Sequence, residues 1–368
     1  MNGNFFELAT SGVQGLQPYQ PGKPIEELER EYGIKNVIKL ASNENPLGPS
    51  PLVLEAIQTH LKEISRYPDG NGFLLKHALA HKHSLKPNMI TLGNGSNDVL
   101  ELIARAFVTS EHSVIFSQHA FAVYPLVTQA IGAKAIKIPA HNWGHDLTAM
   151  QAAIRDDTRL IFIANPNNPT GTWVDKTILK AFLEAVPKQV LVVVDEAYFE
   201  YASENTAYPD SLTWLATYPN LIVCRTFSKA YGLAGLRIGY AVSHPDVANL
   251  LNRVRQPFNV NSMALVAAET ALTDHEYLNK SIALNRVGMQ QITQAFAKMQ
   301  LDFIPSLGNF ISVNVGDGGK IYELLLHQGI ITRPIGGGYE MPQHLRISIG
   351  TTAENIAFIE ALEKVYQS

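Results

Sequence analysis

A single lysine, Lys229, stands in a segment of hydroxyl-bearing and small residues that also carries an arginine (TFSKAYGLAGLRIG, residues 226–239). A lysine amine that is partly neutral can form a Schiff base with an aldehyde cofactor. Thr226, Ser228 and Arg237 suit a phosphate group, and an arginine can bind two phosphate oxygens at once. A lysine of this kind beside a phosphate site is what pyridoxal 5′-phosphate requires. The segment therefore predicts that Lys229 holds this cofactor; the alternative is an ordinary surface lysine in a glycine-rich loop.

A second candidate, Asp195, comes directly after the apolar run 190–194. In open α/β sheets, catalytic residues collect at the carboxyl ends of the strands. An aspartate there can pair with the pyridine nitrogen of the cofactor and keep it protonated, which makes the ring an electron sink. An aspartate that only caps the following helix would have the same place in the sequence, so both interpretations stay open.

Two further segments have the residue types of ligand-binding loops. Gly95, Ser96 and Asn97 link an expected strand to an expected helix. Glycine permits close approach there, and the free N–H groups at a helix start attract phosphate. Ser96 or Asn97 could equally be a simple N-cap. The segment 165–171 (NPNNPTG) contains two prolines and a glycine, which predict a rigid turn.

The composition is that of an ordinary globular protein with room for two domains. The chain has 368 residues, whereas single cores usually stop growing near about 250–300 residues. It is 46% hydrophobic and 17% charged, and its formal charge of −4 does not indicate a nucleic-acid or membrane surface. The only cysteine, Cys224, excludes an intrachain disulfide and suits a reducing compartment. We therefore expect a cytoplasmic protein without a secretory signal, a metal site, or a nucleic-acid or membrane partner.

Short apolar runs alternate with helix-like periods between about residues 50 and 265. The expected strands are residues 89–92, 113–116, 135–138, 160–164, 190–194, 221–224 and 238–242, and helices are expected at 97–108 and 176–185. Runs such as 191–194 are apolar on both faces, as in parallel strands that helices cover on each side. The alternation predicts an α/β domain with a mostly parallel sheet.

The pattern changes beyond about residue 265. A long helical stretch at 263–299 is interrupted near 273–275, and it precedes expected strands at 310–315 and 345–349 and expected helices at 320–327 and 353–366. This texture predicts a smaller α+β domain. The expected division is an N-terminal arm with part of the small domain at 1–44, a large domain at 45–265 and the small C-terminal domain at 266–368.

These segments resemble the fold-type I, pyridoxal-phosphate-dependent aminotransferases, and the resemblance spans nearly the whole chain. It is carried by the segment around Lys229, by NPNNPTG and by the order of the candidate sites. It implies a large domain with a mostly parallel, seven-stranded sheet and a smaller α+β domain. Asn168 and Tyr198 would bond the 3′-oxygen of the cofactor. Phe121 would stack on the pyridine ring, where many relatives have tyrosine, or it is a plain core residue. The phosphate would be bound by Gly95, Ser96, Asn97, Thr226, Ser228 and Arg237.

Finer segments resemble the histidinol-phosphate aminotransferase family. They are residues 16–27, 40–51, 66–70 and 255–261. In that family the tyrosine that matches Tyr67 reaches the cofactor phosphate of the other subunit, so the resemblance implies a homodimer. Tyr19 and Asn43 would line the substrate pocket. The implied reaction transfers the amino group of L-histidinol phosphate to 2-oxoglutarate, and gives imidazole-acetol phosphate and L-glutamate in histidine biosynthesis.

Two arginines near the C-terminus suit a substrate with anionic groups at both ends. Arg346 matches the arginine that binds the amino acid carboxylate in many relatives, and Arg333 is the second candidate; either could instead be a buried structural arginine. The loop 336–342 is about one residue longer than usual, with Glu340 where glycine is common.

Other functions share these motifs. Aromatic amino acid aminotransferases and threonine-phosphate decarboxylase have the same scaffold, so both remain alternatives. A ligand-sensing domain of a transcriptional regulator would need a DNA-binding module, for which the match from about residue 16 leaves no room.

Overall fold

A seven-stranded sheet forms the centre of the larger part of the molecule. The computed structural model describes residues 5–18 and 22–367. In spatial order the strands are β2 (Ile90–Gly93), β8 (Gly239–Val242), β7 (Leu221–Thr226), β6 (Leu191–Asp195), β5 (Thr158–Ala164), β3 (Ser113–Ser117) and β4 (Lys134–Ile138). Only β8 runs antiparallel to its neighbours, β2 and β7. All seven expected strands are present within two residues of their predicted bounds, so the prediction of a mostly parallel sheet is confirmed.

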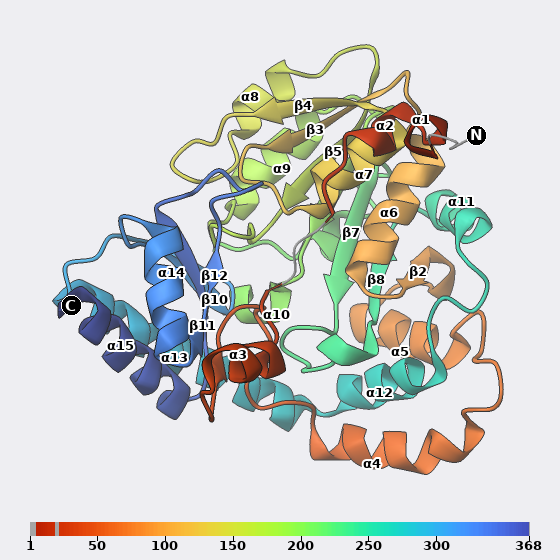
Figure 1. Ribbon diagram of the computed structural model, residues 1–368. Helices are drawn as coiled ribbons and strands as arrows, with labels where there is room; N and C mark the ends of the chain where they lie inside the picture. Colours follow the sequence, from red (N-terminus) through yellow and green to blue (C-terminus); the bar gives the residue numbers. More distant parts are fainter. Residues whose placement is uncertain (1–4, 19–21, 368) are drawn as a thin grey trace.

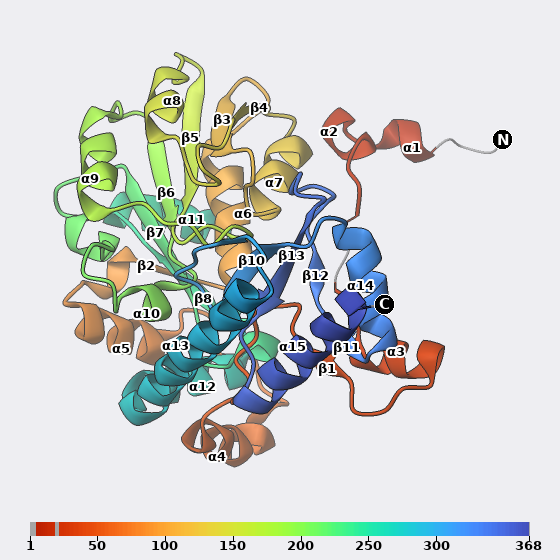
Figure 2. The same ribbon diagram turned by 90° about the vertical axis from the view of Figure 1, so that its left-hand side faces the viewer.

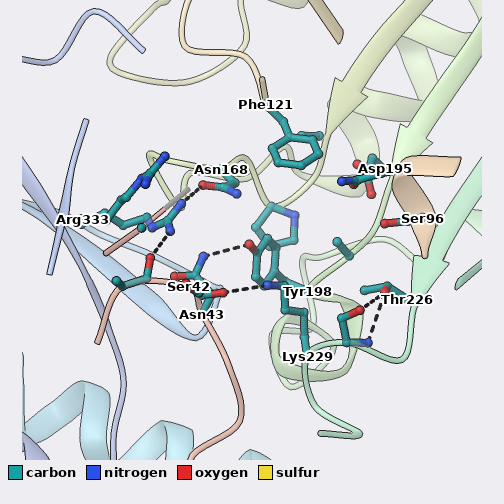
Figure 3. A pocket seen from close by; sticks show the side chains of 18 of the residues that line it. Ser42, Asn43, Ser96, Phe121, Asn168, Asp195, Tyr198, Thr226, Lys229 and Arg333 are labelled. Atoms are coloured by element: carbon teal, nitrogen blue, oxygen red, sulfur yellow. Dashed lines mark hydrogen bonds between the residues drawn. The ribbon is translucent and has the colours of Figure 1, made fainter. Parts of the chain in front are cut away.

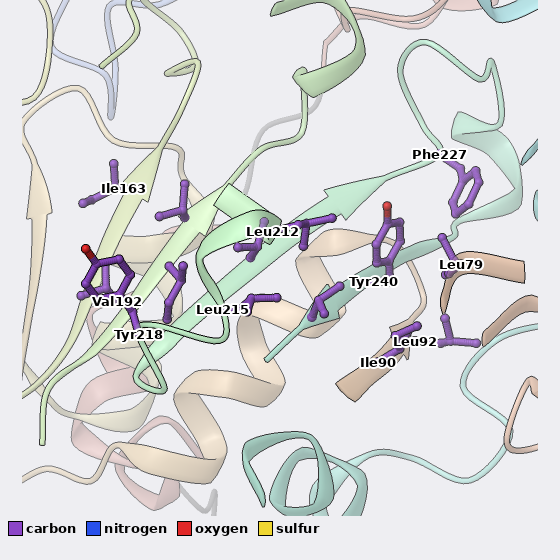
Figure 4. Packing of buried hydrophobic residues seen from close by; sticks show 14 of the residues in the cluster. Leu79, Ile90, Leu92, Ile163, Val192, Leu212, Leu215, Tyr218, Phe227 and Tyr240 are labelled. Atoms are coloured by element: carbon purple, nitrogen blue, oxygen red, sulfur yellow. The ribbon is translucent and has the colours of Figure 1, made fainter. Parts of the chain in front are cut away.

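Alternate residues of the central strands enter two separate apolar layers, because successive side chains of a strand point to opposite faces. Ile163 and Val192 belong to one layer, which Figure 4 shows together with Leu212, Leu215 and Tyr240. Phe162, Val193 and Cys224 belong to the other layer. Helices cover both faces of the sheet (Figure 1). This double cover explains why the central strands are apolar throughout.

The helices of the two layers come from different parts of the chain. One layer includes buried residues of α4 (Pro51–His60), α5 (Phe73–His83), α8 (Leu147–Ala152), α9 (Lys176–Ala185) and α12 (Ser262–Thr273). The other includes α6 (Ser96–Phe107), α7 (Val123–Ile131) and α11 (Pro245–Val254). The short helices α1 (Phe5–Leu8) and α2 (Ser11–Gln14) precede them, and α2 packs on α7.

A smaller α+β unit, as predicted, follows the large sheet. Its antiparallel sheet has the order β12 (Arg333–Pro334), β13 (His344–Ser348), β10 (Phe310–Asn314) and β9 (Phe303–Ile304). Helices α13 (His275–Lys298), α14 (Gly318–His327) and α15 (Thr352–Gln367) share its apolar cluster. Figure 2 shows α13 and α15 side by side.

The N-terminal segment lies against this smaller unit. Strand β1 (Ile38–Lys39) pairs in parallel with β11 (Ile330–Ile331). Helix α3 (Ile25–Tyr32) buries Leu28 against Leu326 of α14. Since β1 is only two residues long, it has no periodicity by which a sequence pattern could find it.

Asp274 marks the passage between the two parts of the chain. Its side chain accepts a hydrogen bond from the backbone N–H of Tyr277 (3.0 Å) and caps α13. Before it, Ala264, Ala268 and Leu272 of α12 pack in the apolar layer of the large sheet. The division at residue 265 stays a proposal, and this packing favours a boundary at Asp274.

Candidate active site

The predicted site residues meet in one cavity at the carboxyl ends of β5, β6 and β7, where the small unit faces the large sheet (Figure 3). Those that line it are Asn43, Ser96, Asn97, Phe121, Asn168, Asp195, Tyr198, Thr226, Ser228, Lys229, Arg237, Arg333 and Arg346. They are far apart in the sequence, so the fold itself assembles the site. The position at the strand ends is where such folds bind ligands.

Two predicted residues are placed otherwise. Gly95 does not line the cavity, but it precedes α6 directly beneath Arg237. Tyr67 is 83% exposed and stacks on Phe258, with ring centroids 4.7 Å apart. Tyr19 lies outside the described residues.

Lys229 follows β7 and extends into the cavity. Its Nζ donates a hydrogen bond to the carbonyl oxygen of Ser42 (3.1 Å) and lies 5.7 Å from the ring centre of Tyr198. Loss of hydration, followed by the charge of Arg346, lowers the pKa of this amine to about 7. A neutral fraction is therefore present near neutral pH, as a nucleophilic amine requires.

Asp195 is the last residue of β6, and the hydroxyl of Tyr124 orients its carboxylate. Its Oδ2 accepts a hydrogen bond from the hydroxyl of Tyr124 (2.8 Å), whose ring stacks on Phe162 at 4.5 Å. Its Oδ1 is buried and has no hydrogen-bond partner among the described residues. A buried polar atom without a partner is costly, so this oxygen fits a donor that a ligand brings. The capping alternative is wrong, because the N-cap of the next helix, α10 (Phe199–Ala202), is Tyr198.

Burial raises the pKa of Asp195 to about 6, and the hydrogen bonds from the hydroxyl of Tyr124 and the backbone N–H of Ala197 oppose this rise. A cationic donor at Oδ1 would favour the ionised form further. The carboxylate therefore fits a protonated ring nitrogen.

A cradle for an anion lies beside Lys229, at the start of α6. Gly95 has φ +84°, and a Cβ at this position would lie 2.3 Å from Nη2 of Arg237, so the guanidinium packs where only glycine leaves room. Ser96 begins the helix itself, and Gly95 is the N-cap without a side-chain bond, so the alternative of a Ser96 or Asn97 cap is wrong. The free N–H groups of the first helical turn attract anions.

Hydroxyl groups from the end of β7 complete this cradle. The Oγ1 of Thr226 donates to Oγ of Ser228 (3.0 Å) and accepts from the backbone N–H of Ser228 (3.1 Å). Arg237 adds a charge from the other side, and its backbone is held at φ 57°. Hydroxyls, a guanidinium and a helix N-terminus thus converge as a phosphate requires.

The opposite wall of the cavity carries two arginines from neighbouring strands. Arg333 of β12 pairs directly with Arg346 of β13 in the antiparallel register. Arg346 donates to Oδ1 of Asn168 and to the carbonyl oxygen of Ala41, both at 2.6 Å. Like charges opposite each other on one sheet are unfavourable, so this pair suits a negatively charged ligand.

Tyr198 is fixed by a network that joins three segments. The Nδ2 of Asn43 donates to the hydroxyl of Tyr198 (2.9 Å), and Oδ1 of Asn43 accepts from Oγ of Ser348 (3.0 Å). Burial raises the pKa of Tyr198 to about 12, so the phenol stays protonated and can donate to a ligand. Asn43 therefore lines the cavity and also orients the tyrosine.

Phe121 and the 165–171 turn face the cavity from the large sheet. Phe121 is half-buried and meets Tyr124 edge-on, with centroids 5.8 Å apart. Asn167, inside the turn, donates to the carbonyl oxygen of His119 (3.0 Å) and so ties the turn to the segment that carries Phe121. The turn thus places Asn168 and Phe121 around the same space.

Sequence reasoning missed three residues that hold the site: Ser42, Tyr124 and Ser348. Tyr124 had one signal, because it lies three residues after Phe121 at the start of a helix. Ser42 acts through its backbone carbonyl and Ser348 through a hydroxyl on a strand, and neither contact leaves a pattern in the sequence. No group of His, Cys, Asp and Glu among residues 5–18 and 22–367 has the arrangement of a metal site. No helix in these ranges is long and apolar enough to cross a membrane.

Comparisons with known proteins agree with this geometry. The family described as aminotransferase class I and II matches residues 35–362. The chain is 58% identical to histidinol-phosphate aminotransferase 1 of Nitrosococcus oceani over 364 residues, which cover 99% of this chain and 98% of that protein. It is 57% identical to histidinol-phosphate aminotransferase 1 of Idiomarina loihiensis, over 98% of both chains. The solved structure of histidinol-phosphate aminotransferase from Sinorhizobium meliloti in complex with pyridoxal-5′-phosphate superposes with a TM-score of 0.88, at 32% identity and over 97% of both chains.

Proposed function

The chain belongs to the class I and II aminotransferases, and from this we propose that it transfers the amino group of L-histidinol phosphate to 2-oxoglutarate with pyridoxal 5′-phosphate as cofactor. The products are imidazole-acetol phosphate and L-glutamate, in histidine biosynthesis. One observation carries the cofactor assignment: Lys229 and Asp195, whose buried Oδ1 has no hydrogen-bond partner among the described residues, line the same cavity beside the cradle at the start of α6. We also propose that the protein is cytoplasmic, because a chain with a single cysteine, Cys224, suits a reducing compartment.

The cofactor, when bound, supplies an electron-withdrawing ring that stabilises negative charge at the substrate Cα. Lys229 would hold the cofactor through its aldehyde, and its Nζ, when free, would move the proton that leaves the substrate Cα. Asp195 would keep the ring nitrogen protonated, and the hydrogen bond from the hydroxyl of Tyr124 orients its carboxylate. The lowered pKa of Lys229 suits a group that must both accept and donate a proton near neutral pH.

The remaining residues of the cavity would bind the cofactor and hold it in one orientation. The first turn of α6, with Thr226, Ser228 and Arg237, would bind the 5′-phosphate. Asn168 and Tyr198 would bond the 3′-oxygen, with Phe121 against the ring face. These roles keep the ring in one orientation relative to Lys229, which is the main condition for a selective proton transfer.

The substrate assignment rests on the named relatives and on the paired arginines. Arg333 and Arg346 would bind the phosphoester of one substrate and the carboxylates of the other. An aromatic amino acid aminotransferase remains the second candidate, because a partly aromatic cavity that accepts an imidazole ring could also accept a phenyl ring, and Tyr339 lines this cavity. Apolar pockets distinguish similar rings by only about 1–3 kcal/mol, so the charged end of the substrate must supply the selectivity.

We expect kcat/KM for histidinol phosphate to exceed that for phenylalanine and tyrosine by at least about 10²-fold, with 2-oxoglutarate as acceptor, because the arginines lose their anionic partner when the phosphate is absent. The measurement is steady-state kinetics with the three amino donors. A preference for the aromatic amino acids would move the chain to the second candidate. Release of carbon dioxide from threonine phosphate would move it to the decarboxylases.

We propose further that the active unit is a homodimer with shared sites. Tyr67 does not line the cavity of its own chain; it stacks on the exposed Phe258 (45%), and Ile64 (70%), Phe73 (55%) and Leu74 (63%), which lie near it in the sequence, are also exposed. Exposed apolar groups at this density are typical of a protein interface. In a symmetric pair Tyr67 would reach the cofactor phosphate of the partner subunit.

A mixing experiment tests this arrangement. Lys229→Ala and Tyr67→Ala subunits should each be weakly active alone, and refolding them together should restore up to about one quarter of the wild-type activity, since half of the dimers then carry one intact site. Activity of the mixture equal to the average of the two parents would contradict shared sites. A monomer that is fully active at low concentration would contradict the dimer itself.

A further inference from the structure

The loop between β12 and β13 carries one cavity residue and one strained residue in direct succession. Tyr339 lines the cavity and is 8% exposed, and Glu340, which follows it, has φ 58°. The left-handed region is unfavourable for a residue with a Cβ, whereas glycine enters it freely. Strain of this kind persists only where surrounding contacts hold it, and it often marks a functional position.

The contacts that hold Glu340 come from the large sheet. One carboxylate oxygen pairs with Nζ of Lys137 on β4, and the other accepts a hydrogen bond from Nε2 of Gln118 (2.9 Å), which follows β3. Both bonds therefore join the loop of the small unit to the large one. The side chains of Lys137 and Glu340 are 49% and 42% exposed, so this pair lies at the rim of the interface. Dissolved salt therefore screens the attraction between its two charges.

A second contact fixes the backbone beside it. Nδ1 of His119 donates to the carbonyl oxygen of Tyr339 (2.7 Å), and Tyr339 also packs against Ala122. Gln118, His119 and Ala122 belong to the segment that carries Phe121 over the cavity. The loop and this segment thus form one wall of the cavity, and the contacts of Glu340 join the two at the outer edge of that wall.

We propose that Glu340 is a positioning residue, which latches the 336–341 loop to Lys137 and Gln118 and so holds Tyr339 against the bound substrate. The inference rests on the proposed function for the identity of the substrate. Because His119 still holds the loop backbone when the latch is broken, the effect is on substrate affinity rather than on chemistry. An exposed ion pair of this kind predicts an increase in KM of about two- to fivefold, with little change in kcat.

The test compares Glu340→Gly, Lys137→Met and the double variant as holoenzymes. Each should raise KM for histidinol phosphate, speed hydrogen exchange in residues 336–341, and remove the part of the salt dependence of KM that the latch contributes. The double variant should resemble Glu340→Gly, because that change already removes both contacts, whereas Lys137→Met leaves the bond from Gln118 and should give a smaller rise in KM. Glu340→Gln keeps an acceptor for Gln118 and should give a smaller rise in KM. Lys134→Met is the matched control. Lys134 lies on β4, like Lys137, but its ion pair is with Asp157 (2.9 Å), away from the loop. This variant should change neither KM nor the hydrogen exchange of residues 336–341.

Two outcomes would overturn the latch. If Glu340 and Lys137 act only through their charges on an anionic substrate, Glu340→Gly should lower KM while Lys137→Met raises it; the latch predicts a rise in both. Unchanged exchange in residues 336–341 would also contradict it, and this readout does not depend on the substrate. Glu340→Gly should keep its thermal midpoint, since relief of the strained backbone offsets the extra freedom of the unfolded chain. If wild type does not use histidinol phosphate at all, the proposed function fails while hydrogen exchange still decides the latch.

Discussion

Replacing Lys229 by alanine should lower kcat by at least about 10³-fold, while pyridoxal phosphate and substrate still bind. Two functions are lost together: the covalent attachment of the cofactor and the proton transfer between Cα and C4′. The groups proposed to bind the cofactor phosphate, Thr226, Ser228 and Arg237, stay in place in this variant. Single-turnover kinetics with preloaded cofactor separates binding from chemistry.

Chemical labelling gives the direct measurement. Borohydride should remove the near-ultraviolet or visible absorbance of the wild-type holoenzyme and leave the cofactor on Lys229, whereas Lys229→Ala should take up no label. Lys76→Met is the matched control, because Lys76 is another buried lysine whose pKa is lowered, to about 8, and it does not line the cavity. We expect kcat of that variant to fall by less than about tenfold. A label on another lysine, or near-normal turnover by Lys229→Ala, would refute the central assignment.

The pH dependence of cofactor attachment follows from the same geometry. An exposed lysine amine is almost wholly protonated at pH 8, but burial and Arg346 lower the pKa of Lys229 to about 7. The neutral, nucleophilic fraction therefore rises through pH 7, and the rate at which the cofactor-free chain is labelled should rise there and level off by about pH 8.

The strands of the large sheet were predictable because burial on both faces makes them apolar throughout. The passage from α12 to α13 was predictable for another local reason, since Asp274 can cap a helix wherever it lies. The strands β1, β9, β11 and β12 were not predicted. Each has two residues, and such a strand depends on its partner for its existence.

The residues of the candidate site also fall into those that could be predicted from the sequence and those that could not. Lys229, Asp195 and the start of α6 could be identified because the residues next to them in the sequence have the types that their chemistry requires. The contacts of Tyr124 with Asp195 and of Asn43 with Tyr198 join positions 71 and 155 residues apart, and only the fold brings them together. The sequence showed Glu340 at a position where glycine is common, but it did not show that Lys137 and Gln118 are its partners.

Asp195→Asn should lower kcat by about 10²–10³-fold, because the amide cannot hold the positive charge on the ring nitrogen that the reaction needs. The substitution conserves size, and the amide can still accept from Tyr124. Asp195→Glu keeps the charge and should recover part of the activity if the longer side chain reaches the same nitrogen. The measurement is kcat together with the absorbance of the bound cofactor, which reports the protonation state of the ring.

Stability separates this electrostatic role from a structural one. The pKa of Asp195 is raised from 3.8 to about 6 in the folded, cofactor-free chain, so the folded state binds a proton more tightly than the unfolded one. Ionisation of this buried group therefore destabilises the chain as pH rises from about 4 through about 6, by about 3 kcal/mol at neutral pH. Asp195→Asn removes that penalty, and the cofactor-free variant should unfold at an equal or higher temperature than wild type at pH 7.

Tyr124→Phe should change the pKa of Asp195 while it leaves the carboxylate itself in place. The hydrogen bond from Tyr124 lowers this pKa, so its loss should raise it and move the acid limb of the kcat profile to higher pH, with a smaller loss of rate than Asp195→Asn. If Asp195→Asn lost stability along with activity and Tyr124→Phe left the pH profile unchanged, the aspartate would be a packing residue. A stable, inactive Asp195→Asn with a shifted profile in Tyr124→Phe requires a carboxylate that acts through its charge.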